Sequence, residues 1–408
     1  MTSTVDTSPA EVPDFPMTRA AGRPFDPPPV ARAKQEEAAL TRVRLWDGST
    51  PWLVTRYAEQ RALLSDPRVS ADIATPGYPS PAPLPKGGAA SRISFILMDD
   101  PEHNRLRRMV TAPFSMRRVA AMRPAIQKIV DDLIDELLAG PRPVDLVDAF
   151  ALPVPSLVIC ELLGVPYGDH DFFQDSSKVI IRRDATPEER MAGHQALTGY
   201  LARLVADKEA HPADDLLSGL ATRVTAGELT RAEAAQMGVL LLIAGHETTA
   251  NMIALGTLAL LEHPDQLALL RESDDPELVA SATEELLRYL NITHNGRRRV
   301  ALEDIEIAGE VVRAGEGLIL ANDIANRDTS VFTDPDRLDI TRDAHRHVAF
   351  GFGVHQCLGQ QLARLELQVA YGTLYRRIPT LALAADLADI PFKHDGSVYG
   401  VYELPVTW

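Results

Sequence analysis

The stretch Phe350-Gly-Phe-Gly-Val-His-Gln-Cys-Leu-Gly359 places one of the two cysteines of the chain, Cys357, directly before a predicted helix. Apolar residues spaced three, four and seven apart from Leu362 to Leu374 indicate this helix. Unpaired N–H groups and the positive end of the helix dipole favour a thiolate at such a position. The glycines of the stretch are expected to leave room for a large flat ligand against the backbone.

A lone soft thiolate in an apolar, backbone-lined socket suits a haem iron that takes its proximal ligand from cysteine. The alternative is a buried structural cysteine beside a loop, which is the default for a single Cys. That alternative explains neither the glycines nor the phenylalanine and histidine around Cys357. Cys160 is the contrasting case, because it lies in an apolar helical run without glycines and is predicted to be a packed core residue.

Five residues of the stretch carry a family resemblance. They match the signature of the cytochrome P-450 haem-thiolate proteins, F-x-x-G-x-H/R-x-C-x-G: Phe350, Gly353, His355, Cys357 and Gly359. The resemblance implies that Cys357 is the axial ligand of haem b. It also implies that the neighbouring residues contact the cofactor, namely Phe350, Gly351, His355 and Gly359.

Composition frames what the chain can be. It has 408 residues, 45% hydrophobic and 24% charged, which is typical of a soluble globular protein. Its longest wholly apolar run, Val239 to Ala244, is far short of the ~18 residues that cross a membrane. A net charge of −16 argues against nucleic-acid binding. Two cysteines without pairing spacing and a start without a secretory signal favour a cytoplasmic location.

Helical periodicity dominates the chain, so the fold class is mainly α with a small β portion. We expect a flexible tail at residues 1–15 and a single domain at 16–408, with a lid-like loop rich in proline and glycine from Pro76 to Gly88. The predicted helices are Val119–Leu138, Pro187–Ala210, Thr230–His263, Pro276–Leu290 and Gly359–Arg377. The predicted strands are Val43–Leu45, Trp52–Thr55, Ile305–Ile307 and Gly317–Leu320.

Polar residues interrupt the apolar helix that begins at Thr230, where Thr230 and Glu233 form a capping box. A glycine, an acid and two threonines within residues 244–249 cost stability there unless they are used. Thr248 can donate a hydrogen bond to the carbonyl of Ala244 and open a groove, or the stretch can be a simple helix bend. The resemblance favours the oxygen-activation pattern A/G-G-x-D/E-T. It implies proton delivery by Glu247 and Thr248, and cofactor contacts from Ala244 and Gly245.

Glu285 and Arg288 lie three apart on one predicted helix face. Taken alone they indicate a solvated surface pair. The resemblance implies instead a buried Glu-x-x-Arg pair, closed by an arginine from the later loop Phe332–Arg337. Arg337 is therefore the expected third member, and the three residues are interpreted as structural rather than catalytic.

Basic residues that could bind the two haem propionates are spread along the chain. His103 and Arg107 fall one turn apart on a helix that opens at Asp100, where cations make charge-assisted hydrogen bonds to carboxylates. The resemblance adds His355 and one arginine of the run 297–299; Arg299 is chosen over Arg297 and Arg298 only because it stands five residues before Asp304. The alternative for the basic run 105–108 is a solvated face, which is the interpretation for Arg105 and Arg108.

The resemblance covers residues 15 to 408, and its motifs occur in family order. It implies a mainly helical single domain, similar to the soluble actinomycete group that oxidises secondary metabolites, sterol-like compounds and xenobiotics. The expected reaction is a monooxygenation, in which one atom of dioxygen hydroxylates a C–H bond. Electrons would come from NAD(P)H through ferredoxin reductase and ferredoxin, and the protein is expected to be a monomer.

Two other functions remain open at this point. A peroxide-driven peroxygenase of the same fold would not need Glu247 and Thr248, so their presence argues against it. A non-enzymatic haem sensor or carrier should lack that pair of residues or carry an output domain, and the chain has neither property.

The substrate is expected to be a bulky, largely apolar molecule with a few oxygens, such as a polyketide, terpenoid or sterol-like compound. The residues expected around it are Ile93, Ile180, Ile181, Leu240, Ala244, Thr293 and Val398. On the cysteine side of the haem, a basic patch is expected to receive ferredoxin. Its candidates are Arg105, Arg108, Arg117, Arg118 and Arg364.

Overall fold

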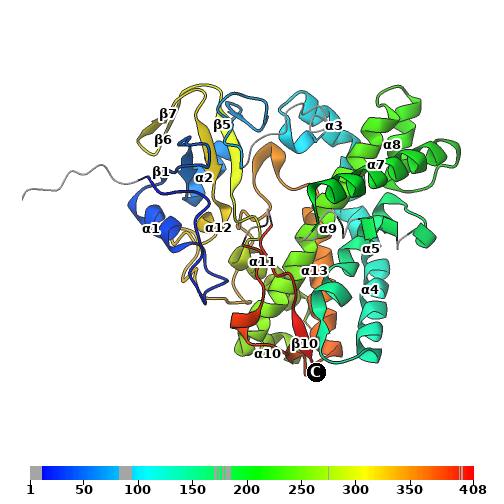
Figure 1. The fold of residues 1–408 in the computed structure, drawn as a ribbon. Coiled ribbons are helices and arrows are strands. Elements are labelled where there is room, and N and C mark those ends of the chain that lie inside the picture. Colours follow the sequence, from blue (N-terminus) through cyan, green and yellow to red (C-terminus); the bar gives the residue numbers. More distant parts are fainter. Residues whose placement is uncertain are drawn as a thin grey trace, which may run out of the picture.

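Helices form most of the protein, and most of them gather on one side; β1, β5, β6 and β7 lie on the other side with α1 and α2, while β10 lies beside α10 (Figure 1). The computed structural model describes residues 12–81, 94–169, 172–173, 175–176, 179, 185–273, 275–394, 396 and 398–408. The helices are α1 (Pro29–Glu37), α2 (Tyr57–Leu64), α3 (Glu102–Thr111), α4 (Met116–Ala139), α5 (Pro153–Leu163), α7 (Pro187–Ala210), α8 (Leu216–Thr225), α9 (Arg231–Leu261), α10 (Pro264–Glu272), α11 (Pro276–Leu290), α12 (Asn322–Ala325) and α13 (Gln360–Arg377).

The strands are short and form three small sheets. The five-stranded sheet has the order β1-β2-β8-β5-β3, and its strands pair antiparallel except β2 with β8. The other sheets are β4-β10-β9 and β6-β7. The strands are β1 (Leu40–Arg42), β2 (Trp52–Val54), β3 (Val69–Ser70), β4 (Val144–Asp145), β5 (Arg297–Ala301), β6 (Ile305–Ile307), β7 (Glu310–Val312), β8 (Gly317–Leu320), β9 (Ala382–Leu383) and β10 (Pro405–Thr407). The prediction of a mainly α protein with a small β portion is confirmed.

Helix α9 is the centre of the fold. It packs against α5, α7, α8 and α13, and it begins with the predicted capping box of Thr230 and Glu233. Within the described ranges it is the one helix long and apolar enough to cross a membrane, but 67% of that apolar segment is buried inside the fold. A helix that is apolar all round and covered by other helices is the core helix of a globular domain.

The predicted element bounds agree with the structure where periodicity is strong. Pro187–Ala210, Pro276–Leu290 and Gly317–Leu320 match α7, α11 and β8 residue for residue. The strand predicted at Val43–Leu45 is wrong, because β1 spans Leu40–Arg42. Val43 and Leu45 follow the strand and are buried in a separate apolar cluster, so alternation continues past its end.

The N-terminal boundary also differs from the prediction. Residues 13–15 were assigned to a flexible tail, yet they pair with Arg44. The Arg44 N–H donates to the Pro13 carbonyl at 2.8 Å, and the Phe15 N–H donates to the Arg44 carbonyl at 2.8 Å. These backbone bonds attach the chain to the hairpin of β1 and β2 from residue 13 onward.

Cys160 is a core residue, as predicted. It lies in α5, is fully buried, and burial raises the pKa of its thiol to about 12. Its thiol therefore stays protonated at neutral pH and behaves as a small apolar group.

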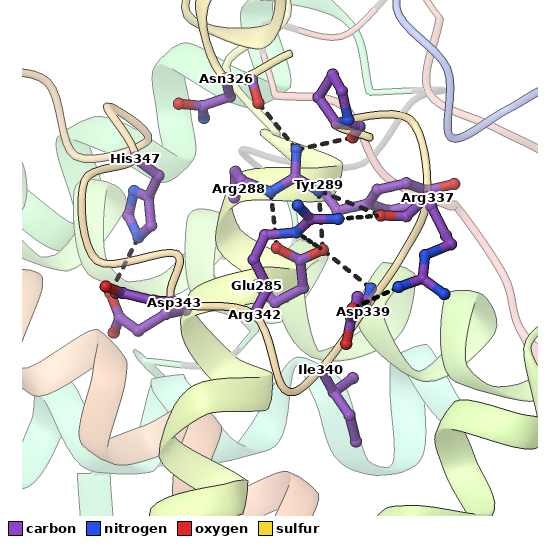
Figure 2. A network of polar contacts seen from close by, with 12 residues as sticks. Glu285, Arg288, Tyr289, Asn326, Arg337, Asp339, Ile340, Arg342, Asp343 and His347 are labelled. Carbon is purple, nitrogen blue, oxygen red and sulfur yellow. Dashed lines mark hydrogen bonds and ion pairs between the residues drawn. The ribbon is translucent and has the colours of Figure 1, made fainter. Parts of the chain in front are cut away.

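The buried pair Glu285–Arg288 is closed by a different arginine from the one expected (Figure 2). Arg342 donates from Nε to Oε1 of Glu285 at 3.1 Å. Arg337 instead pairs with Asp339 at 2.7 Å, and its side chain is 67% exposed. The chain reverses near Asp334, where φ is 45°, so the later arginine returns to the carboxylate. The prediction of Arg337 as the third member is corrected to Arg342.

A second buried carboxylate stands beside the first. Glu284 accepts hydrogen bonds from Arg364 in α13 at 2.6 Å and from His347 at 3.1 Å. Burial opposes a charge on Glu284, but these bonds outweigh it and lower the pKa of Glu284 to about 2. We call the six residues of these two adjacent bonded groups the framework network: Glu284, Glu285, Arg288, Arg342, His347 and Arg364.

Candidate active site

A cavity of about 280 Å³ lies between α9 and the start of α13. The connection between α11 and β5 and residues of α3 complete its wall. Most of the lining side chains are apolar, as in ligand pockets generally. Of the residues predicted to bind the cofactor, those that line the cavity are Arg107, Ala244, Gly245, Phe350, His355, Cys357 and Gly359.

The loop of residues 350–359, here called the cysteine loop, carries Cys357 into the cavity. The Cys357 N–H donates to the carbonyl of Phe350 at 2.9 Å, which closes the loop on itself. Gly353 has φ 72°, and a Cβ there would lie 2.1 Å from the carbonyl oxygen of Leu64 in α2. Gly351 also has φ 72°, and its Cβ would lie 2.9 Å from Nε of Arg297.

These two glycines were expected to make room for a ligand, and the structure shows that they also make room for neighbouring parts of the protein. Gly353 admits the backbone of α2, and Gly351 admits the side chain of Arg297. Neither is among the residues that line the cavity, whereas Gly359 is. The glycines shape the loop and its packing, and the loop then presents Cys357.

Burial raises the pKa of the Cys357 thiol. A hydrogen bond from the Gly359 N–H and the charges of Arg297 and Arg107 act in the opposite direction. Cys357 stands three residues before the first residue of α13, so the helix dipole alone does not decide its charge. A thiolate at this buried position therefore needs a positive partner, which a metal ion supplies.

On α9, the predicted bond between Thr248 and Ala244 is present. Oγ1 of Thr248 donates to the carbonyl of Ala244 at 2.6 Å, and both residues line the cavity. Glu247 is partly buried and does not line the cavity. Burial raises the pKa of its carboxyl, while the charges of Lys393 and Arg190 act against this. An alcohol at the cavity and an acid beside it thus occupy consecutive positions of one helix.

Three buried nitrogen atoms beside the cavity have no hydrogen-bond partner within the described part of the chain. They are Nε2 of His103, Nδ1 of His355 and one terminal guanidinium nitrogen of Arg297. The rings of His103 and His355 lie 4.1 Å apart between centroids. We call these three residues the open donor group. Buried donors are normally paired, so their arrangement indicates an acceptor that the protein itself does not provide.

The charges around these donors favour an anion. Burial, followed by the neighbouring basic groups of Arg299, His103 and Arg107, lowers the pKa of His355 to about 3. Arg107 donates to the carbonyl of Gln356 at 2.6 Å, which holds it at the cysteine loop. His103 bonds Asp100 through Nδ1 at 3.1 Å, so its other nitrogen points elsewhere. Carboxylates added at this site would relieve the repulsion between the basic groups.

Spacing alone selected Arg299 over Arg297 and Arg298. Arg299 is buried, but it is Arg297 that lines the cavity. Burial lowers the pKa of Arg297 to about 10, and its side chain donates to the Ala349 carbonyl at 3.0 Å. Because side chains alternate along a strand, residues two apart in β5 share a face. That alternation was the available signal for both arginines.

Glu366 in α13 is a residue that the sequence did not reveal. It lines the cavity, and its Oε2 has no hydrogen-bond partner among the described residues. Burial raises the pKa of its carboxyl to about 8. Glu366 is therefore protonated and uncharged at neutral pH, the reverse of Glu284.

The residues present fit a haem group. A flat, apolar macrocycle with two carboxylates requires apolar walls, a thiol on one side and buried cationic donors at one edge. The cavity has apolar lining, Cys357 and the open donor group in these roles.

The predicted substrate residues are only partly assembled at the cavity. Leu240, Ala244 and Thr293 line it, and Val398 does not. Ile93, Ile180 and Ile181 lie outside the described residues, as does most of the predicted lid, from residue 82 onward. Phe95 and Ile96 from the segment before α3 add apolar surface.

Comparison with known proteins agrees with this geometry. The family model described as cytochrome P450 matches residues 194–378. Cytochrome P450 GfsF of Streptomyces halstedii is 58% identical over 98% of this chain and 97% of its own length. The crystal structure of GfsF superposes with a TM-score of 0.93 at 57% identity, covering 97% of this chain and 100% of that one.

Two further relatives have names that state a reaction. Vitamin D3 dihydroxylase of Streptomyces griseolus is 45% identical over 100% of both chains. The mycinamicin VIII C21 methyl hydroxylase MycCI of Micromonospora griseorubida, solved bound to mycinamicin VIII, is 42% identical with a TM-score of 0.85, covering 97% of this chain and 100% of that one. Identity at this level over the full length establishes the family. The position of Cys357 at the cavity agrees with it. The chain belongs to the cytochrome P450 family and is a haem-thiolate monooxygenase.

Proposed function

We propose that this enzyme hydroxylates a bulky, largely apolar small molecule that carries a few oxygens, of the polyketide, terpenoid or sterol-like class. The observation that carries the proposal is a cavity with mostly apolar walls and Cys357 in its lining. The relatives support the class, because one is named for vitamin D3 and another is bound to mycinamicin VIII.

Each residue around the cofactor receives a role in this proposal. Cys357 would bind the haem iron, and His103, Arg107, Arg297, Arg299 and His355 would hold the two haem carboxylates. When bound, haem supplies the chemistry that activates dioxygen and transfers one oxygen atom to a C–H bond. The apolar walls contributed by α9 and by the segment before α3 orient the substrate and exclude stray water.

Proton delivery is assigned to Glu247 and Thr248. The Thr248 hydroxyl is the polar group of the pair that lines the cavity, and it can pass a proton while its own hydrogen bond to Ala244 is exchanged. Glu247 lies one position before it, and burial raises the pKa of its carboxyl, which brings the acid closer to neutral pH. This pair distinguishes a monooxygenase from a peroxide-driven enzyme, which needs no such protons.

Electrons are proposed to come from NAD(P)H through ferredoxin reductase and ferredoxin, in the cytoplasm, to a monomeric enzyme. Of the five arginines expected to form the docking patch, three are already paired. Arg105 bonds Glu102, Arg118 bonds Asp214 and Arg364 bonds Glu284. The exposed Arg108 and Arg117 are the candidates that support docking of an acidic partner.

A screen for substrates tests the proposal. The ferric enzyme is titrated with vitamin D3, a macrolide aglycone and a small polar acid, and the shift from low to high spin is followed. Any binder is then turned over with a surrogate ferredoxin system under ¹⁸O₂. Labelled oxygen in the product of an apolar binder is the expected result. Turnover with hydrogen peroxide alone at equal coupling would favour a peroxygenase, and binding of the small acid alone would overturn the substrate class.

A further inference from the structure

One polar side chain in the cavity wall serves neither the cofactor site nor proton delivery. Asn291 follows the last residue of α11 and lines the cavity beside Ile292 and Thr293. It is buried, with a relative exposure of 2%. Most of its neighbours in that wall are apolar, so an amide there is costly unless it finds a partner.

The amide of Asn291 is half satisfied. Its Oδ1 accepts a hydrogen bond from the Thr293 hydroxyl at 3.3 Å. Its Nδ2 is buried and has no hydrogen-bond partner among the residues that the structure describes. In this orientation the Thr293 hydroxyl donates to the oxygen end of the amide, and the NH₂ end remains available. Native proteins leave few buried donors unpaired, so a missing acceptor is indicated.

The backbone conformation offers a second explanation for an asparagine at position 291, and it must be separated from a role in binding. Asn291 has φ 30° and ψ 89°, in the left-handed region that follows a helix end. Asparagine and glycine are the residues that favour this conformation. An asparagine chosen only for its backbone would need no donor in a cavity, and glycine would replace it without loss of function.

We propose that Asn291 is a specificity-determining residue, whose Nδ2 donates a hydrogen bond to a neutral oxygen of the substrate. This inference rests on the proposed function and deepens it, because it names a chemical requirement of the substrate. The requirement is an acceptor such as a ketone, ester carbonyl or ether, located on the part of the molecule that faces the connection between α11 and β5.

A neutral acceptor fits better than a carboxylate for a physical reason. The Asn291 amide is uncharged, and its neighbour His294 is held neutral because burial, opposed by its bond to Gly396, lowers the pKa of His294 to about 4. A charged group placed there would lose its hydration without gaining a charged partner. Arg297 also lines the cavity, but it is assigned to the cofactor carboxylates.

Matched ligands test the inference in the holoenzyme. Cyclododecanone and cyclododecane share a ring skeleton and differ by one carbonyl oxygen. Their dissociation constants are measured by titration calorimetry and by the spin-state shift of the ferric enzyme. The wild type is expected to bind the ketone about tenfold more tightly than the hydrocarbon, which corresponds to about 1.4 kcal/mol.

Three variants separate the donor from the backbone. Asn291→Gly keeps the left-handed conformation and removes the amide, so the preference for the ketone should disappear while hydrocarbon binding is unchanged. Asn291→Asp keeps the shape and replaces the donor by an acceptor, so it should lower ketone affinity at least as much. Asn295→Ala is the control, because Asn295 lies four residues later, does not line the cavity and bonds the Gly396 carbonyl.

The outcomes are distinguishable. An unchanged preference for the ketone in both Asn291 variants would overturn the role of Asn291 and leave the proposed function standing. Equal losses for the ketone and the hydrocarbon, or loss of haem binding in both variants, would assign Asn291 to the framework and overturn the inference as well. Binding of neither probe by the wild type would instead overturn the substrate class on which the inference rests.

Discussion

The protein contains two buried polar regions that differ in how far their hydrogen bonds are satisfied. In the framework network each carboxylate meets several donors, and Arg288 bonds Glu285 and the carbonyls of Asn326 and Pro335. In the open donor group and at Asn291, buried donors lack partners within the described residues. A saturated network holds the fold by itself, whereas an unsaturated one is completed by a ligand. Other buried atoms, such as Nδ2 of Asn326 and Nε of Arg327, also lack partners among those residues, so a binding residue is marked by an unpaired donor together with a place at or beside the cavity.

The largest expected effect is on the cofactor spectrum and comes from a change at the cavity. Replacing Cys357 by His should abolish the thiolate-type absorption of the reduced carbon-monoxide complex, because the sulfur ligand is lost. Absorption spectra of the reduced protein with and without carbon monoxide measure the effect.

Cys160→Ala provides the control, since Cys160 is a core residue in α5 and should leave the band in place. A band that survives in Cys357→His would show that another residue supplies the axial ligand.

The second prediction concerns the saturated side. Arg288→Met leaves Glu285 buried without its main partner, and breaking such a pair costs about 3–5 kcal/mol of unfolding free energy. Arg342→Met should cost less, because Glu285 keeps its bonds to Arg288. Urea unfolding followed by circular dichroism measures both.

Arg337→Ala is the matched control, and we expect it to change the unfolding free energy by less than about 0.5 kcal/mol because its side chain is exposed. A loss at Arg337 as large as at Arg342 would restore the original assignment of the third member.

The third prediction compares the two extreme carboxyls by their pH dependence. Glu366 has a folded pKa of about 8, above its reference value of 4.5, so the folded state holds an extra proton between these values. Stability must then fall as pH rises through this window, by up to about 1.4 kcal/mol per pH unit. Glu366→Gln removes this dependence, and the variant should gain on the wild type between pH 6 and 8.

Glu284 has the opposite sign. Its folded pKa of about 2 lies below 4.5, so its contribution is present above pH 4.5 and is lost as pH falls toward 2. Glu284→Gln should be less stable than the wild type at pH 7, with a difference that shrinks in acid. Unfolding free energies of Glu366→Gln across pH 4–9, and of Glu284→Gln from pH 7 down to about pH 2, test the signs. Parallel curves for wild type and Glu366→Gln would refute the buried, protonated state of Glu366.

The sequence predicted some residues of the framework network and of the open donor group but not others, and the reasons are physical. The buried pair Glu285–Arg288 lies within one helix, so spacing alone located it. The third arginine depends on a chain reversal near Asp334, and local spacing cannot distinguish Arg337 from Arg342. The same holds for Gly353, whose conformation makes room for the carbonyl of Leu64, far away in the sequence.

The site itself was predictable where local order determines it. Glu247 and Thr248 are adjacent within α9, and Cys357 lies directly before α13, so local sequence was enough to single them out. The structure places them at or beside the cavity. Arg297 was ranked below Arg299, and Glu366 was missed, because their importance comes from burial without a partner, which only packing reveals. Long, periodic helices such as α7 and α11 were placed correctly because periodicity alone determines their bounds.

The fourth prediction concerns the hydroxyl at the cavity. Thr248→Ala should still bind haem and substrate but divert electrons to peroxide or water, lowering the coupling of reductant to product by about tenfold or more. Product and hydrogen peroxide formed per NAD(P)H consumed provide the measurement.

Thr249→Ala should have a smaller effect, because Thr249 lies one residue further round the helix and, within the described residues, only Thr248 of the two donates to the Ala244 carbonyl. Equal coupling in wild type and Thr248→Ala would remove Thr248 from proton delivery.

The smallest expected effect lies outside both regions, on the surface that would receive ferredoxin. Arg108→Glu reverses an exposed charge that has no ion pair within the described residues, so it should lower ferredoxin-driven turnover about threefold to tenfold at low salt. The loss should shrink near 0.15 M salt, where the Debye length falls to about 8 Å.

Arg364→Glu is a poor test of docking, because Arg364 belongs to the framework network through Glu284. Arg118→Glu is the better control, since Asp214 already neutralises Arg118 and reversal there should matter less. Equal salt dependence in wild type and Arg108→Glu would place the docking surface elsewhere.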